Sequence, residues 1–212
     1  DTTLDDHFLL DFHRTCAHPL AAQLLDLRSE VVREAAACVV ALAARGGGNR
    51  GRFPPMVLEA IAPALLRLLA VPHRVLADHG NLAAVATFTA CRHPKLVKLL
   101  ADEMEQTKSS HVRLRVCEYL SRILADWPSA VLQRCQADAQ HAVTLGLQDA
   151  ATEVRRAARS CYHVFEAVWP AQAARLLAAL GPKEQQLILH GSLDSPKEEI
   201  LRRGAGAGVK VF

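Results

Sequence analysis

A pattern of residues recurs along this chain at a spacing of about 42 positions. Val112 and Trp127 have counterparts one such interval later in Val154 and Trp169, and each tryptophan is followed by proline. An earlier copy surrounds Val31, which precedes Val112 by nearly two such intervals. A chain that repeats itself at this spacing folds as a series of similar units, each packed on its neighbours.

Each unit has the pattern of helices rather than strands. From residue 153 to 168, apolar residues follow one another at spacings of three and four, which is typical of a helix with one face in the core. Asp149 opens the preceding turn, Thr152 is the expected N-cap, and Pro170 ends the helix. A period of about 40–47 residues built from helix pairs is typical of HEAT or armadillo repeats. The sequence therefore predicts an all-α solenoid of HEAT repeats.

Prolines and short polar turns mark the expected helix boundaries. They divide the chain into about five helix pairs with a half-pair at the start. That half-pair could be the second helix of an incomplete first repeat. The expected helices are 5–15, 19–25, 30–45, 55–70 with a kink at Pro63, 75–91, 95–105, 111–126, 129–147, 153–168, 171–180 and 183–191. Beyond residue 192 the apolar period fades, and only a short helix at 198–203 is expected. We therefore predict one repeat domain over 1–192 and a C-terminal extension or linker over 193–212.

The composition argues against several classes of site. No apolar run reaches about 18–20 residues, so no membrane span is expected. The six cysteines form no Cys-x-x-Cys pair and fall mostly on apolar helix faces, which predicts free thiols, no metal and a reducing compartment. No phosphate-binding loop and no acid–base or nucleophile arrangement appears. We therefore expect no catalytic residue, no cofactor and no enzymatic activity.

The turns inside the helix pairs carry most of the candidate binding residues. These turns, at 26–29, 72–74, 106–110 and 148–152, should lie along one edge of a solenoid. Their basic residues include Arg28, Arg74, Lys108, Arg113 and Arg155. The last two fall in the first turn of their helices, where a cation opposes the helix dipole. This placement favours an anionic partner, although the alternative is that Arg155 bonds to a neighbouring repeat.

Three segments of the chain resemble a known family. Asp26-Leu-Arg-Ser-Glu-Val-Val-Arg-Glu-Ala35, Cys117-Glu-Tyr119 with Trp127, and the segment from Glu153 to Tyr162 with Trp169-Pro170 are similar to a TOG domain of the cytoplasmic linker-associated proteins, CLASP, most of all to its second TOG domain. The resemblance covers roughly residues 5–190. It implies a flat array of six HEAT repeats that binds tubulin through its turns and regulates microtubule dynamics by suppressing catastrophe and promoting rescue.

Carried over by position, the resemblance implies a set of tubulin-binding residues: Arg28, Arg74, Lys108, Arg113 and Arg155. One feature departs from the family: a tryptophan or similar aromatic is expected in the first repeat's turn, whereas both tryptophans here lie far downstream, so either the first helix is missing or the aromatic contact is absent. The resemblance also implies a monomeric domain that binds tubulin or microtubules, not nucleic acid or membrane, in the cytoplasm and cytoskeleton. Two alternatives stay open: a TOG-array protein of ciliary microtubules, and a HEAT adaptor that binds a protein on its concave helix surface.

Overall fold

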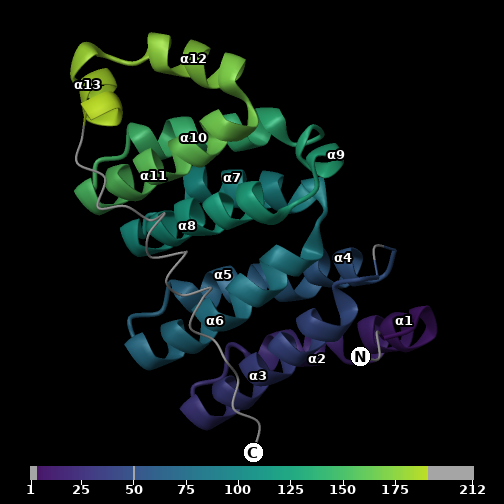
Figure 1. Cartoon of the computed structure of the whole chain (residues 1–212). Coiled ribbons are helices and arrows are strands. Elements are labelled where there is room, and N and C mark those ends of the chain that lie inside the picture. The colour runs from purple at the N-terminus through teal and green to yellow at the C-terminus, as the bar shows by residue number, and fades with distance from the viewer. Residues whose placement is uncertain (1–3, 50, 191–212) are drawn as a thin grey trace, which may run out of the picture.

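The computed structural model describes residues 4–49 and 51–190, and all the regular structure in these ranges is helical (Figure 1). Most helices form pairs joined by short turns. One π-helical segment, η1, interrupts the helix that the sequence predicts over 55–70. The elements in chain order are α1 (Asp6–Thr15), α2 (Ala17–Gln23), α3 (Ser29–Gly46), α4 (Phe53–Met56), η1 (Val57–Ile61), α5 (Ala62–Leu69), α6 (Arg74–Cys91), α7 (Pro94–Gln106), α8 (Ser110–Asp126), α9 (Ser129–Leu132), α10 (Gln136–Leu147), α11 (Thr152–Val168), α12 (Pro170–Ala179) and α13 (Pro182–His190).

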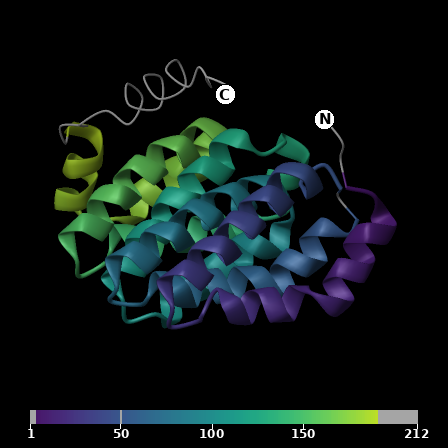
Figure 2. The same cartoon turned by 90° about the horizontal axis from the view of Figure 1, so that it is seen from below.

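The helices form two layers. The second helices of the pairs, α3, α6, α8 and α11, pack side by side in chain order. The first helices form the other layer, in which α2 contacts η1 and α7 contacts α10. Figures 1 and 2 show the pairs stacked one after another from α2–α3 to α10–α11. The predicted all-α solenoid of helical repeats is confirmed.

The core between the layers consists mainly of leucine, valine and alanine side chains. Small residues allow the helices to approach closely. A Cβ atom on Gly146 of α10 would lie 2.8 Å from the Cβ of Ala158 and 3.1 Å from the Sγ of Cys117. Glycine at this position therefore lets α10 pack directly against α8 and α11.

Aromatic residues join neighbouring repeats. The rings of Phe88 on α6 and Tyr119 on α8 meet edge to face, with centroids 5.2 Å apart. The Tyr119 hydroxyl donates to Asn81 Oδ1 at 2.8 Å, and the indole N–H of Trp127 donates to the Thr89 carbonyl at 3.0 Å. Buried tyrosine and tryptophan usually find such polar partners. These bonds link α8 and its C-terminal end to α6 in the preceding repeat.

The prediction of one continuous helix over 129–147 is wrong. It is divided into α9 and α10 by a break at residues 133–135. Leu132 and Cys135 are both buried there, and the Cys135 thiol lies 3.3 Å from the Leu132 carbonyl, to which it donates. The apolar residues keep a helical spacing across the break, so the sequence pattern did not reveal it.

The kink expected at Pro63 takes the form of η1, the π-helical segment just before this proline. Proline lacks an N–H and its ring clashes with the carbonyl four residues earlier, which here is that of Glu59. A wider turn at Val57–Ile61 relieves this conflict without ending the helix. At the C-terminal end, α13 matches the last expected helix, whereas the helix at 198–203 and the extension at 193–212 lie outside the described residues.

Candidate functional site

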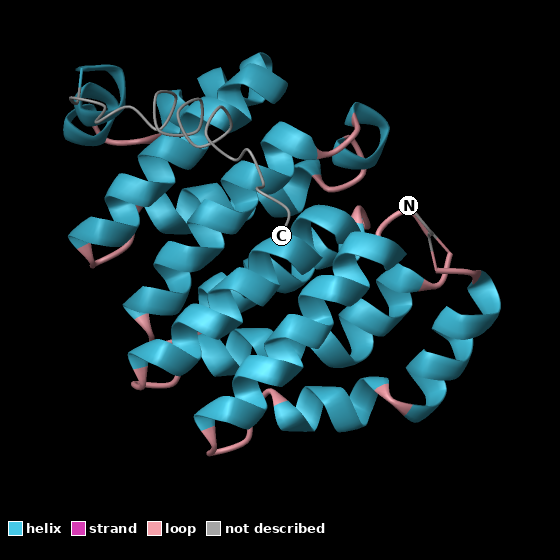
Figure 3. Cartoon of the chain, turned by 60° about the horizontal axis from the view of Figure 1, so that its bottom comes forward, coloured by secondary structure: helices cyan, strands magenta, loops and turns pink. Residues whose placement is uncertain are grey.

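The turns inside the helix pairs follow one another along one edge of the solenoid, as Figures 1 and 3 show. They join α2 to α3, α5 to α6, α7 to α8, and α10 to α11. We call this surface the turn edge, and define it by these turns, residues 26–28, 70–73, 107–109 and 148–151, together with the first turn of the helix that follows each. The arrangement arises because every first helix runs toward this edge and every second helix runs away from it. The expected common edge is therefore confirmed.

Arg28 lies in the first of these turns and its side chain is 74% exposed. Asp26 organises the turn, because its carboxylate accepts bonds from the backbone N–H of Arg28 at 2.8 Å and from the guanidinium Nε and Nη2 at 3.0 and 2.9 Å. These bonds from Arg28 lower the pKa of Asp26 to about 2. Leu27, at the tip of the same turn, is 96% exposed. The turn therefore presents a cation beside an apolar side chain.

Arg74 begins α6 directly after the second turn, and Lys108 lies in the third turn. The Arg74 side chain is 93% exposed, and its Nε lies 3.8 Å from the carboxylate of Asp78, one helical turn further on. Lys108 is exposed, and no carboxylate oxygen of the described residues lies within 4.0 Å of its ammonium group. Val75, next to Arg74, is 52% exposed. Three successive turns thus each present an accessible cation, and two of them pair it with an exposed aliphatic side chain.

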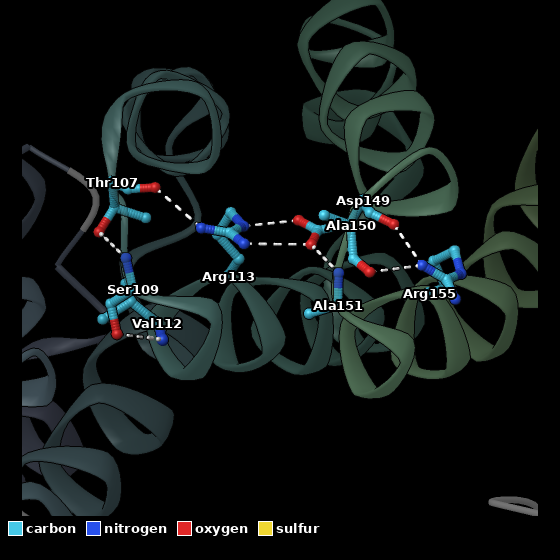
Figure 4. A network of polar contacts seen from close by, with 8 residues as sticks. All are labelled: Thr107, Ser109, Val112, Arg113, Asp149, Ala150, Ala151 and Arg155. Atoms are coloured by element: carbon cyan, nitrogen blue, oxygen red, sulfur yellow. Dashed lines mark hydrogen bonds and ion pairs between the residues drawn. The ribbon is translucent and has the colours of Figure 1, made fainter.

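Arg113 has a different environment, shown in Figure 4. Its Nε and Nη2 donate to the two carboxylate oxygens of Asp149 in the next repeat, and its Nη1 donates to the Thr107 carbonyl at 3.0 Å. The side chains of Arg113 and Asp149 are only 17% and 6% exposed. The guanidinium that the sequence placed among partner contacts is therefore engaged within the protein, where it joins two repeats.

The charge of Asp149 is stabilised in this setting. Burial acts to raise the pKa of Asp149, but the bonds from Arg113 and from the backbone N–H of Ala151 outweigh it and hold the pKa below its ordinary value. The bond to Asp149 also raises the pKa of Arg113. Both groups are therefore charged over the physiological pH range, as a bidentate arginine–carboxylate pair requires.

Arg155 lies half-buried at the start of α11 and bonds to its own turn. Its Nη1 donates to the carbonyls of Asp149 and Ala150, both at 2.7 Å, and its Nη2 donates to the Thr152 hydroxyl at 3.1 Å. The alternative drawn from the sequence, a bond from Arg155 to a neighbouring repeat, is not what these contacts show. The expectation that Thr152 caps the helix is also wrong: it is the first helical residue, and the cap position belongs to Ala151. Asp149 takes the organising role in the turn because its carboxylate reaches the Ala151 N–H.

Sequence reasoning missed the exposed aliphatic residues beside the turn cations. Nothing in the helical period marks Leu27 and Val75, although an apolar side chain at the tip of a polar turn is a signal that could have found the first of them.

The cysteines, the candidate metal ligands and the apolar helices of the described residues suggest no further site. Cys16 and Cys38 are exposed free thiols, and the remaining cysteines are buried free thiols. Within 4–49 and 51–190 no cluster of His, Cys, Asp or Glu could hold a metal, and no helix is long and apolar enough to cross a membrane.

Comparison with known proteins places the chain in a family. It is 29% identical over 171 residues to the CLIP-associated protein of Arabidopsis thaliana, a match that covers 80% of this chain and 12% of that protein. It is 28% identical over 163 residues to CLIP-associating protein 1 of Xenopus tropicalis, covering 77% of this chain and 11% of the relative. A designed armadillo repeat protein superposes with a TM-score of 0.43 at 17% identity, covering 88% of this chain and 86% of its own.

The chain thus spans about an eighth of the length of the curated relatives it matches. The model of the CLASP N-terminal family matches residues 5–189, nearly all of the part that the structure describes. The agreement between this match and the observed helical repeats shows that the chain belongs to the CLASP N-terminal family.

Proposed function

We propose that this chain is a microtubule-associated module that binds tubulin through the turn edge and so regulates microtubule dynamics, suppressing catastrophe and promoting rescue. The observation that carries the proposal is the line of accessible cations at successive turns: Arg28, Arg74 and Lys108. The surface of tubulin is acidic, and complementary charge speeds association and selects the partner. Membership of the CLASP family supports the same function.

The exposed aliphatic residues on this edge strengthen the proposal. Solvated ion pairs at the rim of an interface contribute little each, about 0.2–1 kcal/mol. Leu27 and Val75 can add apolar contact area beside the cations, and such area is worth about 25 cal/mol per Å² removed from water. Binding by this edge therefore combines long-range attraction with local apolar burial. We expect it to weaken as salt increases, because exposed charges are screened within about 8–10 Å.

Arg113 and Arg155 differ in whether their guanidinium groups are free to bind a partner. Arg155 keeps part of its guanidinium free and remains in the proposed tubulin set. Arg113 is engaged by Asp149, so we assign it to the stability of the repeat array rather than to tubulin. In the proposed function the domain acts as a monomer on cytoplasmic microtubules, without catalysis and without binding nucleic acid.

The experiment compares two triple variants that remove the same charge. Arg28→Ala/Arg74→Ala/Lys108→Ala removes the turn-edge cations. Its matched control removes exposed cations near the opposite ends of the helices: Arg45→Ala/Lys95→Ala/Arg134→Ala. Binding is measured by gel filtration with free tubulin and by co-sedimentation with microtubules, and folding by the melting temperature.

We expect the turn-edge triple variant to lose binding at an unchanged melting temperature, while the control triple variant binds as the wild type does. Retained binding by the turn-edge variant would overturn the proposal, and would move the search to the concave helix surface of a HEAT adaptor. Equal loss in both variants would show that net charge, not the turn edge, governs the interaction.

A further inference from the structure

Three cations lie on the edge of the solenoid opposite the turn edge, where one helix pair ends and the next begins (Figure 1). Arg92 lies between α6 and α7, Lys95 in the first turn of α7, and Arg134 in the break between α9 and α10. All three are exposed. No carboxylate oxygen of the described residues lies within 4.0 Å of their charged groups. We call these three residues the junction cluster.

Helix packing brings Lys95 and Arg134 to the same part of this edge. α7 and α10 pack against each other, and both begin here. Lys95 is the second residue of α7, and Arg134 comes two residues before the start of α10. Leu132 and Cys135 are buried on either side of the break between α9 and α10, while Arg134 between them is exposed. The break that the sequence did not reveal therefore adds a cation to the junction cluster.

His93 shows how the cluster acts on its surroundings. Its Nδ1 accepts the backbone N–H of Lys95 at 3.3 Å and so caps α7. The proton of the neutral ring is therefore on Nε2, whose N–H donates to no group of the described residues. Burial lowers the pKa of His93, and the charges of Lys95 and Arg134 lower it further. Both cations therefore act on one point at the start of α7, and no acidic group contributes to this shift.

Every polar group gathered here is a donor: two guanidinium groups, one ammonium group and one imidazole N–H. Lys95 also opposes the dipole of α7, which has no acidic residue in its first turn. A carboxylate offers one negative charge on two oxygens. A phosphorylated serine or threonine offers about −1.5 to −2 charges on three strong acceptor oxygens. A phosphoryl dianion therefore matches three cations and an additional N–H better than a carboxylate does.

The phosphates of single-stranded nucleic acid are a poorer match for this edge. Proteins that bind such strands stack the bases on exposed aromatic side chains. Among the described tryptophan, tyrosine and phenylalanine residues, Phe8 on α1 is the one with a largely exposed side chain. Trp127, which lies next to the junction cluster in the fold, is buried and bonded to the Thr89 carbonyl. The surroundings of the cluster therefore favour a phosphorylated peptide.

We propose that Arg92, Lys95 and Arg134, together with the Nε2–H of His93, bind the phosphoryl group of a phosphorylated serine or threonine in a peptide segment of a partner protein. Charge-assisted bonds from guanidinium and ammonium groups to phosphate oxygens are the strong class of hydrogen bond. The site goes beyond the proposed tubulin function and does not depend on it. It lies on the opposite edge, so tubulin on the turn edge and a phosphorylated partner can be held together.

The test uses the whole chain and a fluorescent peptide with blocked ends, Ala-Ala-phosphoserine-Ala-Ala, beside twins that carry serine or glutamate instead. Binding is followed by fluorescence anisotropy at physiological salt. Lys95→Ala/Arg134→Ala removes two cations of the site, and the matched control Arg122→Ala/Arg175→Ala removes two exposed cations elsewhere. We expect the site variant to bind the phosphopeptide about tenfold more weakly and the control to stay within about twofold of wild type.

His93→Asn tests the imidazole separately. Asparagine is a favoured N-cap whose side-chain oxygen can accept the Lys95 N–H, so the variant keeps the cap of α7 and loses only the Nε2–H. We expect roughly threefold weaker phosphopeptide binding at a melting temperature close to that of wild type. The same variant assigns the His93 signal in NMR spectra of the wild type. The pKa of that ring should rise when the phosphopeptide binds, because a nearby anion favours the charged imidazole.

The two edges are separated by exchanging the variants. Arg28→Ala/Arg74→Ala/Lys108→Ala should bind the phosphopeptide normally, and Lys95→Ala/Arg134→Ala should bind tubulin normally, so each proposal can fail without the other. Equal binding of the phosphoserine and serine peptides, or equal losses in the site and control variants, would overturn the junction site. Equal binding of the glutamate twin would reassign it to carboxylates. Displacement by free inorganic phosphate at equal concentration, or by a short single-stranded RNA, would overturn the peptide assignment.

Discussion

Arg113 and Asp149, which are 36 residues apart in the sequence, form a bidentate ion pair that joins the turn before α8 to the turn before α11. Each partner also bonds to backbone, Arg113 to the Thr107 carbonyl and Asp149 to the Ala151 N–H. One ion pair therefore fixes two turns and the spacing between two repeats. This makes the pair a structural element of the turn edge, and it can be tested separately from tubulin binding.

Replacing Asp149 with alanine should destabilise the domain. The change leaves Arg113 largely buried without its carboxylate, which typically costs about 3–5 kcal/mol. For a domain of this size we expect the melting temperature to fall by roughly 6–20 °C. The matched change Asp102→Ala removes only an exposed pair with Lys98 and should cost no more than about 0.5 kcal/mol. Equal melting temperatures for the two variants would contradict this role.

Acid should weaken the domain partly through Asp149. Because the folded-state pKa of Asp149 lies below its unfolded value of about 3.9, its contribution to the free energy of unfolding is complete above that value and is lost as the pH falls through the folded-state pKa. Urea unfolding between pH 6 and pH 2.5 should show a smaller loss of stability in Asp149→Asn than in wild type. Asp102→Asn is the control, because Asp102 belongs to an exposed ion pair with Lys98 whose contribution is screened.

The two repeat-equivalent tryptophans should respond differently to loss of the indole N–H. Trp127 and Trp169 are 4% and 3% exposed, but only Trp127 donates, to the Thr89 carbonyl, while the Trp169 N–H is buried without a partner in the described residues. We expect Trp127→Phe to cost about 1–2 kcal/mol more than Trp169→Phe, since one variant loses a satisfied bond and the other removes an unsatisfied donor. Chemical denaturation of both variants measures the difference. Equal costs would show that packing alone accounts for both residues.

The cysteines should divide into two reactivity classes. Cys16 and Cys38 are exposed, although burial also raises the pKa of Cys38. Burial raises the pKa of the Cys91 and Cys161 thiols to about 12 and keeps them protonated. A thiol reagent at pH 8 should therefore modify two cysteines quickly in the native protein and all six after denaturation. Fewer than six thiols under denaturing, non-reducing conditions would reveal a disulfide and contradict the expected free thiols.

Much of the fold could be predicted because its information is local. The apolar spacing from 153 to 168 specifies a helix, and its recurrence at a constant interval specifies a stack of similar helix pairs. The common edge of turns follows from that repetition. The break between α9 and α10 could not be predicted in this way, because the buried residues Leu132 and Cys135 keep the spacing of a continuous helix.

The candidate site, like the fold, could be predicted from the sequence only in part. The sequence alone determined which residues occupy the turns and that Arg28, Arg74 and Lys108 recur on one edge, since turn position depends on neighbours in the chain. Only the tertiary structure decided that Arg113 is held by Asp149 while Arg155, in the equivalent position, has no carboxylate. The physical reason is that an ion pair depends on whether the next repeat brings an oxygen within about 3 Å of the guanidinium, and repeat spacing in the sequence does not contain that distance.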